Sequence, residues 1–179
     1  MNRQFSIVSF LLAFALVLTS CDLSASRPGY GRLKLAEFTE SYVNVSIILE
    51  RVDEGEAVLL ATFTPTEEDA HLYSMELPKE GIDGLGRPTL IELPPGASMQ
   101  PAGDLQESVA SYIDEVTPDL PALPLYPVGA VTLSLPVMLP EMDAEWVSDK
   151  LIITYMACTS TGCHKPVISK LVEVQVPTR

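Results

Sequence analysis

Two cysteines near the C-terminal end of the sequence are the residues whose type and spacing best suit chemistry. Cys158 and Cys163 are separated by four residues, two threonines, a serine and a glycine. A turn of this length brings two thiols within reach of a disulfide bond. His164 and Lys165 follow directly. Positive neighbours lower the pKa of a thiol and raise the fraction of thiolate, which is the form that performs thiol–disulfide exchange.

Three uses of this cysteine pair fit the sequence. A disulfide across so short a loop gives little loop-closure stabilisation, which favours a redox role, with Cys163 attacking because of its cationic neighbours. The alternatives are a structural clip and a Cu(I) site, for which Met156, the two cysteines and His164 would be suitably soft ligands. The redox role requires neither cofactor nor metal, and we expect none. The sequence contains no Ser-His-Asp, phosphate-loop or HExxH pattern that would indicate another chemistry.

The N-terminus predicts export and a lipid anchor. Residues 5–18 are apolar and uncharged and follow one positive charge. The stretch is too short for a permanent membrane span, so we predict a secretory signal over residues 1–20. Residues 18–21, Leu-Thr-Ser-Cys, resemble the lipobox of bacterial lipoproteins, which implies a lipid on Cys21. We therefore expect a lipoprotein on the periplasmic side of the cell envelope, with Asp22 favouring the inner membrane.

The composition beyond the signal predicts one folded, acidic domain. Hydrophobic residues make up 47% of the chain and charged residues 20%, which is too apolar for a disordered protein. The 15 prolines and 10 glycines are spread without period, which excludes collagen and a long-helix protein. Once the signal is removed, the net charge is −14, and this charge would repel nucleic acid and anionic membrane surfaces.

Alternating apolar and polar residues predict short β-strands. Residues 43–49 and 57–63 form a predicted hairpin, and further strands are expected at residues 71–75, 89–93, 131–137, 151–158 and 167–176. The last strand would place Ile168, Val172, Val174 and Val176 on one face. Trp146 and Tyr155 are expected in the core. So many short strands predict an all-β, antiparallel β-sandwich.

Residues 94–127 interrupt this pattern. Asp104 and Glu107 can form a capping box, and a helical spacing of apolar residues follows at Leu105, Val109, Ile113 and Val116. Four prolines between residues 118 and 127 then prevent a longer helix. We therefore predict a long, partly helical and Pro-rich insertion. Residues 21–36 are expected to form a flexible tether and residues 37–179 the folded domain.

The cysteine region also resembles a known family. Residues 155–158 (Tyr-Met-Ala-Cys), the four-residue turn, residues 163–166 (Cys-His-Lys-Pro) and a final alternating strand are similar to the end of the periplasmic N-terminal domain of DsbD-type thiol:disulfide interchange proteins. Segments at residues 71–78, 87–94 and 133–137 occur in that family's order. The resemblance covers residues 43–177.

This resemblance implies an immunoglobulin-like sandwich with the activity of a protein-disulfide reductase component. The cysteine pair would take electrons from a membrane donor and pass them to thioredoxin-like periplasmic oxidoreductases. His71 and Tyr73 would lie beside the disulfide. A cap would shield the pair, and three residues of the insertion are candidates for it: Tyr112, Leu125 and Tyr126.

Two functions follow from these observations. The first is a stand-alone, membrane-anchored module for thiol:disulfide exchange, since family members of full length continue into membrane and thioredoxin domains. The alternative is a lipid-anchored binding or copper-handling module whose disulfide is structural. A measured reduction potential separates the two, because structural disulfides of secreted proteins commonly lie below about −300 mV.

Overall fold

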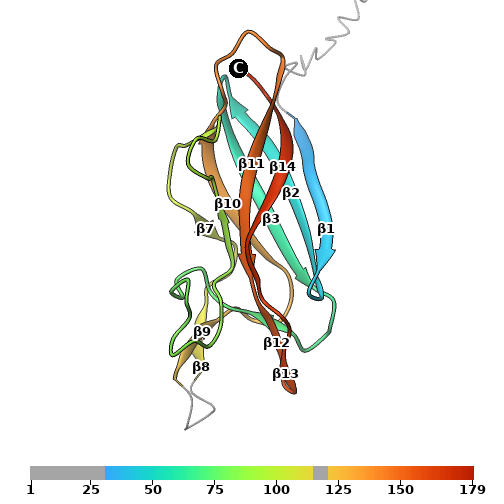
Figure 1. Ribbon diagram of the computed structural model, residues 1–179, viewed down its shortest axis with the longest axis vertical. Coiled ribbons are helices and arrows are strands. Elements are labelled where there is room, and N and C mark those ends of the chain that lie inside the picture. Colours follow the sequence, from blue (N-terminus) through green and yellow to red (C-terminus); the bar gives the residue numbers. More distant parts are fainter. Residues whose placement is uncertain (1–30, 115–120) are drawn as a thin grey trace, which may run out of the picture.

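The computed structural model describes residues 31–114 and 121–179. In this part of the chain all regular structure is β-structure, and the long strands form two antiparallel sheets packed face to face, of immunoglobulin-like architecture (Figure 1). The predicted all-β sandwich is confirmed. The predicted signal and the lipid-bearing Cys21 lie outside the described residues. The described part contains no helix long and apolar enough to cross a membrane.

The larger sheet has the order β1-β2-β3-β10-β6, with β7 also paired to β10. Its long strands are β1 (Arg32–Glu40), β2 (Val43–Asp53), β3 (Glu56–Pro65) and β10 (Val131–Met138), and its short ones are β6 (Gln100–Pro101) and β7 (Gln106–Glu107). Strands β2 and β3 form the predicted hairpin. The smaller sheet has the order β14-β11-β5, from β14 (Val167–Pro177), β11 (Trp146–Tyr155) and β5 (Leu90–Glu92).

The core fills the space between the two sheets because alternate residues of each long strand point inward. Tyr155 and Phe63 are fully buried there and their rings meet edge to face at 5.6 Å. The other buried residues are mostly aliphatic, and those on the strands include Val43, Val45, Ile47, Leu49, Leu59, Val131, Leu133, Val137, Leu151, Ile153, Val172, Val174 and Val176. The predicted core position of Tyr155 is confirmed.

Two small sheets extend from one end of the sandwich, opposite the C-terminus (Figure 1). One has the order β13-β12-β4, from β13 (Gly162–Cys163), β12 (Ala157–Thr159) and β4 (His71–Leu72). The other pairs β8 (Tyr112–Asp114) with β9 (Leu123–Leu125). Since β12 follows the central strand β11 of the smaller sheet after a single residue, the cysteine hairpin is a direct extension of the sandwich.

The predicted helix in the insertion is wrong. Residues 106–107 form β7, which pairs with β10, and residues 112–114 form β8. Glu107, expected to cap the helix, instead accepts a hydrogen bond from the Tyr126 hydroxyl at 2.7 Å. Ile113 is 55% exposed, and Val116 lies outside the described residues. Pairing with a neighbouring strand therefore outweighs the local helical spacing.

Three further expectations differ from the structure. Strand β1 begins at Arg32, inside the range expected for the tether. Ile168 is exposed rather than on the buried face, because β14 carries a bulge opposite Thr154, with Ser169 at a φ of 49°. Such a bulge shifts the alternation of the strand by one residue. Trp146 is 46% exposed, since it begins β11 at the rim of the sandwich.

Candidate redox-active disulfide

Cys158 and Cys163 form a disulfide across the β12–β13 hairpin. The two residues are directly paired in the strand register, with a Cα–Cα distance of 3.9 Å. The Thr159 hydroxyl closes the turn between them, because it accepts a hydrogen bond from the Thr161 amide at 3.2 Å and donates one to the Gly162 carbonyl at 3.2 Å. The disulfide thus joins residues that the hairpin already holds together, so it adds little to the stability of the fold.

The two sulfur-bearing residues differ in their access to solvent. Cys158 is 2% exposed and packs in a small apolar cluster with Tyr73, Leu77 and Leu125. Cys163 lies on the edge strand β13 and is exposed. Both line a groove of about 370 Å³, together with residues of β4, β9 and the hairpin turn. A partner thiol approaching this groove therefore meets Cys163 first.

Tyr73 is the polar group in contact with both sulfur atoms. Its hydroxyl lies 3.2 Å from Cys158 Sγ and 3.8 Å from Cys163 Sγ, and the residue is 5% exposed. A disulfide sulfur carries no hydrogen, so the hydroxyl is the donor in these contacts. When the bond opens, the same hydroxyl is placed to donate to the Cys158 thiolate, which is a much stronger acceptor.

The position of Tyr73 is fixed from two sides. The Thr89 amide and hydroxyl both donate to the Tyr73 carbonyl, at 3.2 and 2.7 Å. Gly86 lies against the ring, and a Cβ added there would approach ring atom Cε1 to 3.0 Å and the Leu77 side chain to 2.8 Å. Gly86 also has a φ of 74°, which side chains rarely adopt. The ring is therefore held in a single place against the disulfide.

His71 lies beside the disulfide on the third strand of the small sheet. It is the direct register partner of Cys158 in β4, so its side chain shares a face of the sheet with both cysteines. Its ring meets the Tyr73 ring edge to face at 5.8 Å. The structure thus has both His71 and Tyr73, which the family resemblance implied beside the disulfide, in contact with the cysteine hairpin.

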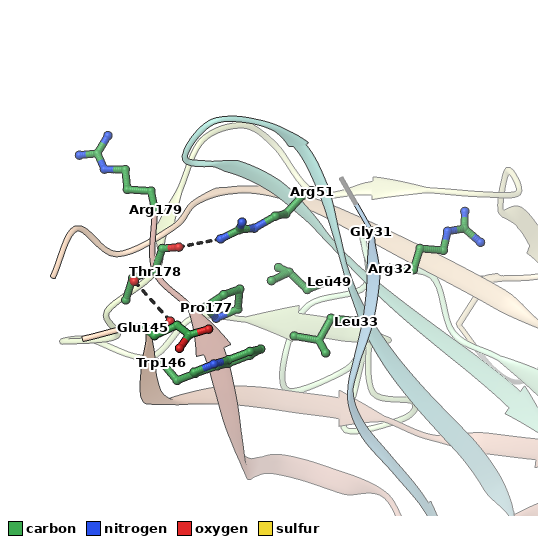
Figure 2. A pocket seen from close by; sticks show the side chains of 10 residues that line it. All are labelled: Gly31, Arg32, Leu33, Leu49, Arg51, Glu145, Trp146, Pro177, Thr178 and Arg179. Carbon is green, nitrogen blue, oxygen red and sulfur yellow. Dashed lines mark hydrogen bonds between the residues drawn. The ribbon is translucent and has the colours of Figure 1, made fainter. Parts of the chain in front are cut away.

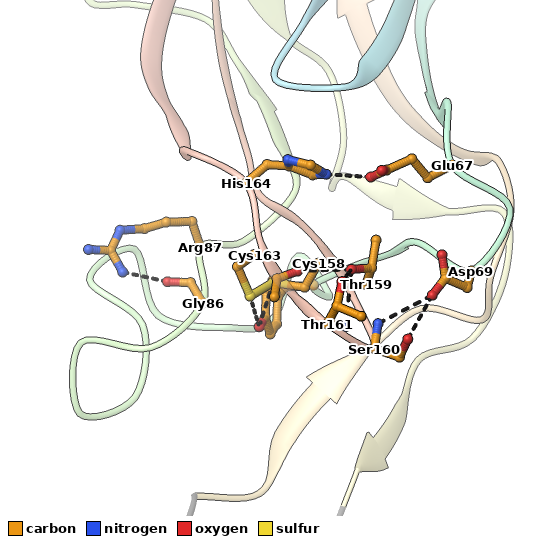
Figure 3. Close-up of a disulfide and its surroundings, with 12 residues drawn as sticks. Glu67, Asp69, Gly86, Arg87, Cys158, Thr159, Ser160, Thr161, Cys163 and His164 are labelled. Carbon is orange, nitrogen blue, oxygen red and sulfur yellow. Dashed lines mark hydrogen bonds and ion pairs between the residues drawn. A yellow bond between two sulfur atoms is a disulfide. The ribbon is translucent and has the colours of Figure 1, made fainter.

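The two predicted cationic neighbours of Cys163 lie in different surroundings. Nε2 of His164 donates a hydrogen bond to the carboxylate of Glu67 (Figure 3). The imidazole stacks on the Tyr42 ring at 4.2 Å. The carboxylate offsets the charge that a protonated imidazole would carry. Lys165 is exposed to solvent, where water and salt screen its charge.

The three candidate cap residues lie in different environments. Leu125 is 4% exposed and belongs to the apolar cluster around Cys158. Tyr112 is 48% exposed and pairs with Leu125 across the β8–β9 hairpin. Tyr126 is fully buried in the main core, where burial and its bond to Glu107 raise the pKa of the phenol. Its position inside the sandwich does not suit a cover for the disulfide.

A second cavity of about 480 Å³ lies at the other end of the sandwich, beside the C-terminal residues (Figure 2). It contains three arginines. Arg32 pairs with Glu50 at 2.8 Å, Arg179 pairs with Glu141 at 2.5 Å, and the guanidinium of Arg51 donates to the Thr178 carbonyl at 2.6 Å. Its lining contains no thiol, so the chemistry of the cysteines belongs to the groove alone.

Metal ligands are not gathered at the hairpin. Across residues 31–114 and 121–179 no group of three His, Cys, Asp or Glu side chains is placed to hold a metal ion. Met156 packs beside the Cys158 cluster, as a core thioether does.

Two carboxylates that the sequence did not single out contact the hairpin. Glu67 binds His164, and Asp69 accepts hydrogen bonds from the Ser160 hydroxyl at 2.9 Å and the Ser160 amide at 3.4 Å (Figure 3). The hydroxyl bond, followed by the amide bond, holds the pKa of Asp69 below its ordinary value of 3.8. Both residues lie in an acidic stretch of a kind usually attributed to a solvated surface, so composition alone did not distinguish them.

Comparison with known proteins gives a structural similarity. No family model and no curated protein matches the sequence. A crystal structure of the N-terminal domain of DsbD from Neisseria meningitidis, in the reduced form, is similar at 17% sequence identity and a TM-score of 0.47. The similarity covers 78% of this chain and 88% of that domain. This degree of similarity leaves the function to be inferred from the disulfide and its surroundings.

Proposed function

We propose that this protein is a thiol:disulfide exchange module that carries reducing equivalents on Cys158 and Cys163. The observation that supports the proposal best is the asymmetry of the disulfide. One cysteine is exposed at the edge of a groove, and the other is buried with the Tyr73 hydroxyl 3.2 Å from its sulfur. Exchange needs this combination, since one sulfur must be reachable and the other must be stabilised when it leaves as a thiolate.

The reaction proceeds in two displacements. The Cys163 thiolate attacks one sulfur of a partner disulfide, and the other partner sulfur leaves as a thiolate. The Cys158 thiolate then attacks Cys163 Sγ, which closes the module's disulfide and releases the second partner sulfur. Two electrons pass to the partner, and the two thiol protons pass to its thiolates. A donor dithiol regenerates the module by the reverse sequence, with Tyr73 donating to Cys158 as it leaves.

The cellular setting forms part of this proposal. Cys21 would carry the lipid that attaches the module to the bacterial membrane, with the inner membrane favoured, and the domain would face the periplasm. Thioredoxin-like oxidoreductases would accept the electrons, and a membrane protein would supply them. The N-terminal sequence and the redox chemistry of the hairpin support this setting.

A trapping experiment tests the exchange chemistry. Cys158→Ala should form a stable mixed disulfide with a thioredoxin-like protein that keeps one active-site cysteine, activated as a mixed disulfide with thionitrobenzoate, because Cys163 displaces thionitrobenzoate and no neighbouring thiol reverses the bond. Cys163→Ala should trap far less, because the remaining thiol is buried. The double variant should trap nothing and keep the circular dichroism of a β-sandwich. If neither single variant traps and the wild-type disulfide has a potential below about −300 mV, the disulfide is structural.

A further inference from the structure

One short segment of the chain contacts the cysteine hairpin at four alternate positions. These positions are Glu67, Asp69, His71 and Tyr73, in the loop after β3 and in and just beyond β4. Of the three residues between them, Ala70 and Leu72 are buried, at 1% and 0% exposure, and Glu68 is exposed. The segment is therefore anchored by its apolar side chains while its polar side chains face the hairpin.

Each of the four residues meets a different part of the hairpin. Tyr73 contacts the sulfur atoms and His71 is the register partner of Cys158. Asp69 holds Ser160 in the turn, and Glu67 holds His164 (Figure 3). The last two contacts flank the exposed strand β13, one on each side of Cys163.

The N-terminal end of this segment is itself hydrogen-bonded to the sandwich. The Thr66 amide donates to the Tyr42 carbonyl at 2.9 Å, and the Thr66 hydroxyl does so at 3.1 Å. Tyr42 lies in the turn between β1 and β2, and its ring covers His164. Three segments that are distant in sequence thus meet at His164, which contacts both Tyr42 and Glu67.

We propose that Glu67 and Asp69 are positioning residues that keep the two thiols of the reduced hairpin close together and so set the reduction potential of the pair. This inference rests on the proposed function. In the oxidised state the disulfide itself fixes β13. In the reduced state, the two-residue strand β13 keeps a short ladder with β12, the Thr159 bond to the Gly162 carbonyl and the bond from the His164 amide to the Ala157 carbonyl. The two carboxylates then add hydrogen bonds from outside the hairpin, where the Tyr42 ring also packs on His164.

The effect of the two carboxylates can be measured as the effective concentration with which one thiol of the pair meets the other. Restraint of the reduced hairpin raises this concentration and favours the disulfide. Its loss makes the disulfide easier to reduce. The charge of the two carboxylates acts separately, because a negative charge near a thiol opposes the thiolate. Amide variants that keep an acceptor oxygen but lose the charge therefore separate positioning from electrostatics.

The test is the equilibrium of the pair with reduced and oxidised glutathione, a small probe that needs no protein partner. Glu67→Ala/Asp69→Ala should lower the effective concentration about tenfold, which raises the midpoint potential by about 30 mV. Glu67→Gln/Asp69→Asn should stay within about threefold of wild type, since both amides can still accept. Glu37→Ala removes a comparable exposed ion pair, with Lys34, and should change nothing.

Two results would overturn the proposal. One is a wild-type potential in the double alanine variant, and the other is an equal shift in the amide and alanine variants, which would assign the effect to charge. Ser160→Ala removes one contact from the hairpin side and should give a smaller shift of the same sign even if the double variant folds poorly. Failure of the trapping experiment alone would concern the proposed partners, because the glutathione equilibrium reports only the hairpin.

Discussion

Replacing Tyr73 by phenylalanine removes one hydroxyl and tests the chemistry assigned to the groove. That hydroxyl lies 3.2 Å from Cys158 Sγ, and both residues are at least nine-tenths buried. Water therefore does not replace the lost bond when the variant is reduced. The ring itself keeps its place, because the contacts with Gly86 and Thr89 do not involve the hydroxyl.

The magnitude follows from the bond that the thiolate loses. A hydrogen bond to a charged group contributes about 1.5 to 3 kcal/mol. One pKa unit corresponds to about 1.4 kcal/mol. Tyr73→Phe should therefore raise the pKa of the Cys158 thiol by about one to two units. Since a thiol of higher pKa is a poorer leaving group, exchange through the pair should also slow.

The assay is the pH dependence of Cys158 alkylation by iodoacetamide in a Cys21→Ala/Cys163→Ala background, where a single thiol gives a single titration. Tyr155→Phe is a matched control, because Tyr155 is as deeply buried and donates to the Glu40 carbonyl at 2.9 Å rather than to sulfur. Its titration should coincide with that of the parent. Coincidence of the Tyr73→Phe titration with the parent would refute the role assigned to the hydroxyl.

Three other predictions concern stability and anchoring. Asp149→Ala should lower the free energy of unfolding by about 2 to 4 kcal/mol in urea titrations. This buried carboxylate accepts two amide hydrogen bonds, at 2.8 and 3.1 Å, from the loop before β6. A loss below about 1 kcal/mol would contradict this prediction. The pKa of Asp69 is lower in the folded state, so its bonds to Ser160 stabilise the hairpin turn above its unfolded pKa of about 3.8 and are lost as the pH falls through the lower, folded value. Amide exchange of Ser160 should accelerate only at such acidic pH, and Asp69→Ala should abolish that transition. Cys21→Ala should release the folded domain from the membrane fraction once the signal is cleaved, and retention would argue against the lipid anchor.

The strands that sequence alternation predicted are those with one face in the core. The apolar residues of β2, β3 and β10 point inward at every second position, and period-2 burial is the signal that alternation records. The sequence did not predict strand β1, because a bulge between Lys34 and Ala36 breaks its alternation. The residues just before the strand are rich in serine, proline and glycine, which also favoured a tether.

The insertion shows where local patterns fail. Leu105 and Val109 do pack against the core, as the helical spacing required. They do so from an extended chain, because β7 supplies hydrogen bonds to the side of β10 that β3 leaves open. Pro136 lies on that open side, where its carbonyl accepts from the Ala102 amide. Such pairing between distant segments leaves no trace in the spacing of a single stretch.

The site shows the same division between local and distant information. The cysteine pair and its turn are local, so their spacing sufficed to predict a disulfide. The contacts from which we argue the proposed function join residues 85 to 97 positions apart: Tyr73 with Cys158, Asp69 with Ser160, and Glu67 with His164. Two of these contacts use carboxylates in a chain rich in acidic residues, where no single one stands out.

The chemistry of the pair therefore depends on what the β3–β4 segment brings to it. A β-hairpin with paired cysteines has two equivalent thiols unless its surroundings distinguish them. Here the distinction comes from one side of the hairpin only, since β4 covers Cys158 while β13 remains an open edge. The same segment supplies a donor to the buried sulfur and acceptors to the turn and to His164. A variant that shifted the β3–β4 segment by one position would turn Ala70 and Leu72 toward the cysteines. The disulfide would then lack the groups that make its two sulfur atoms different.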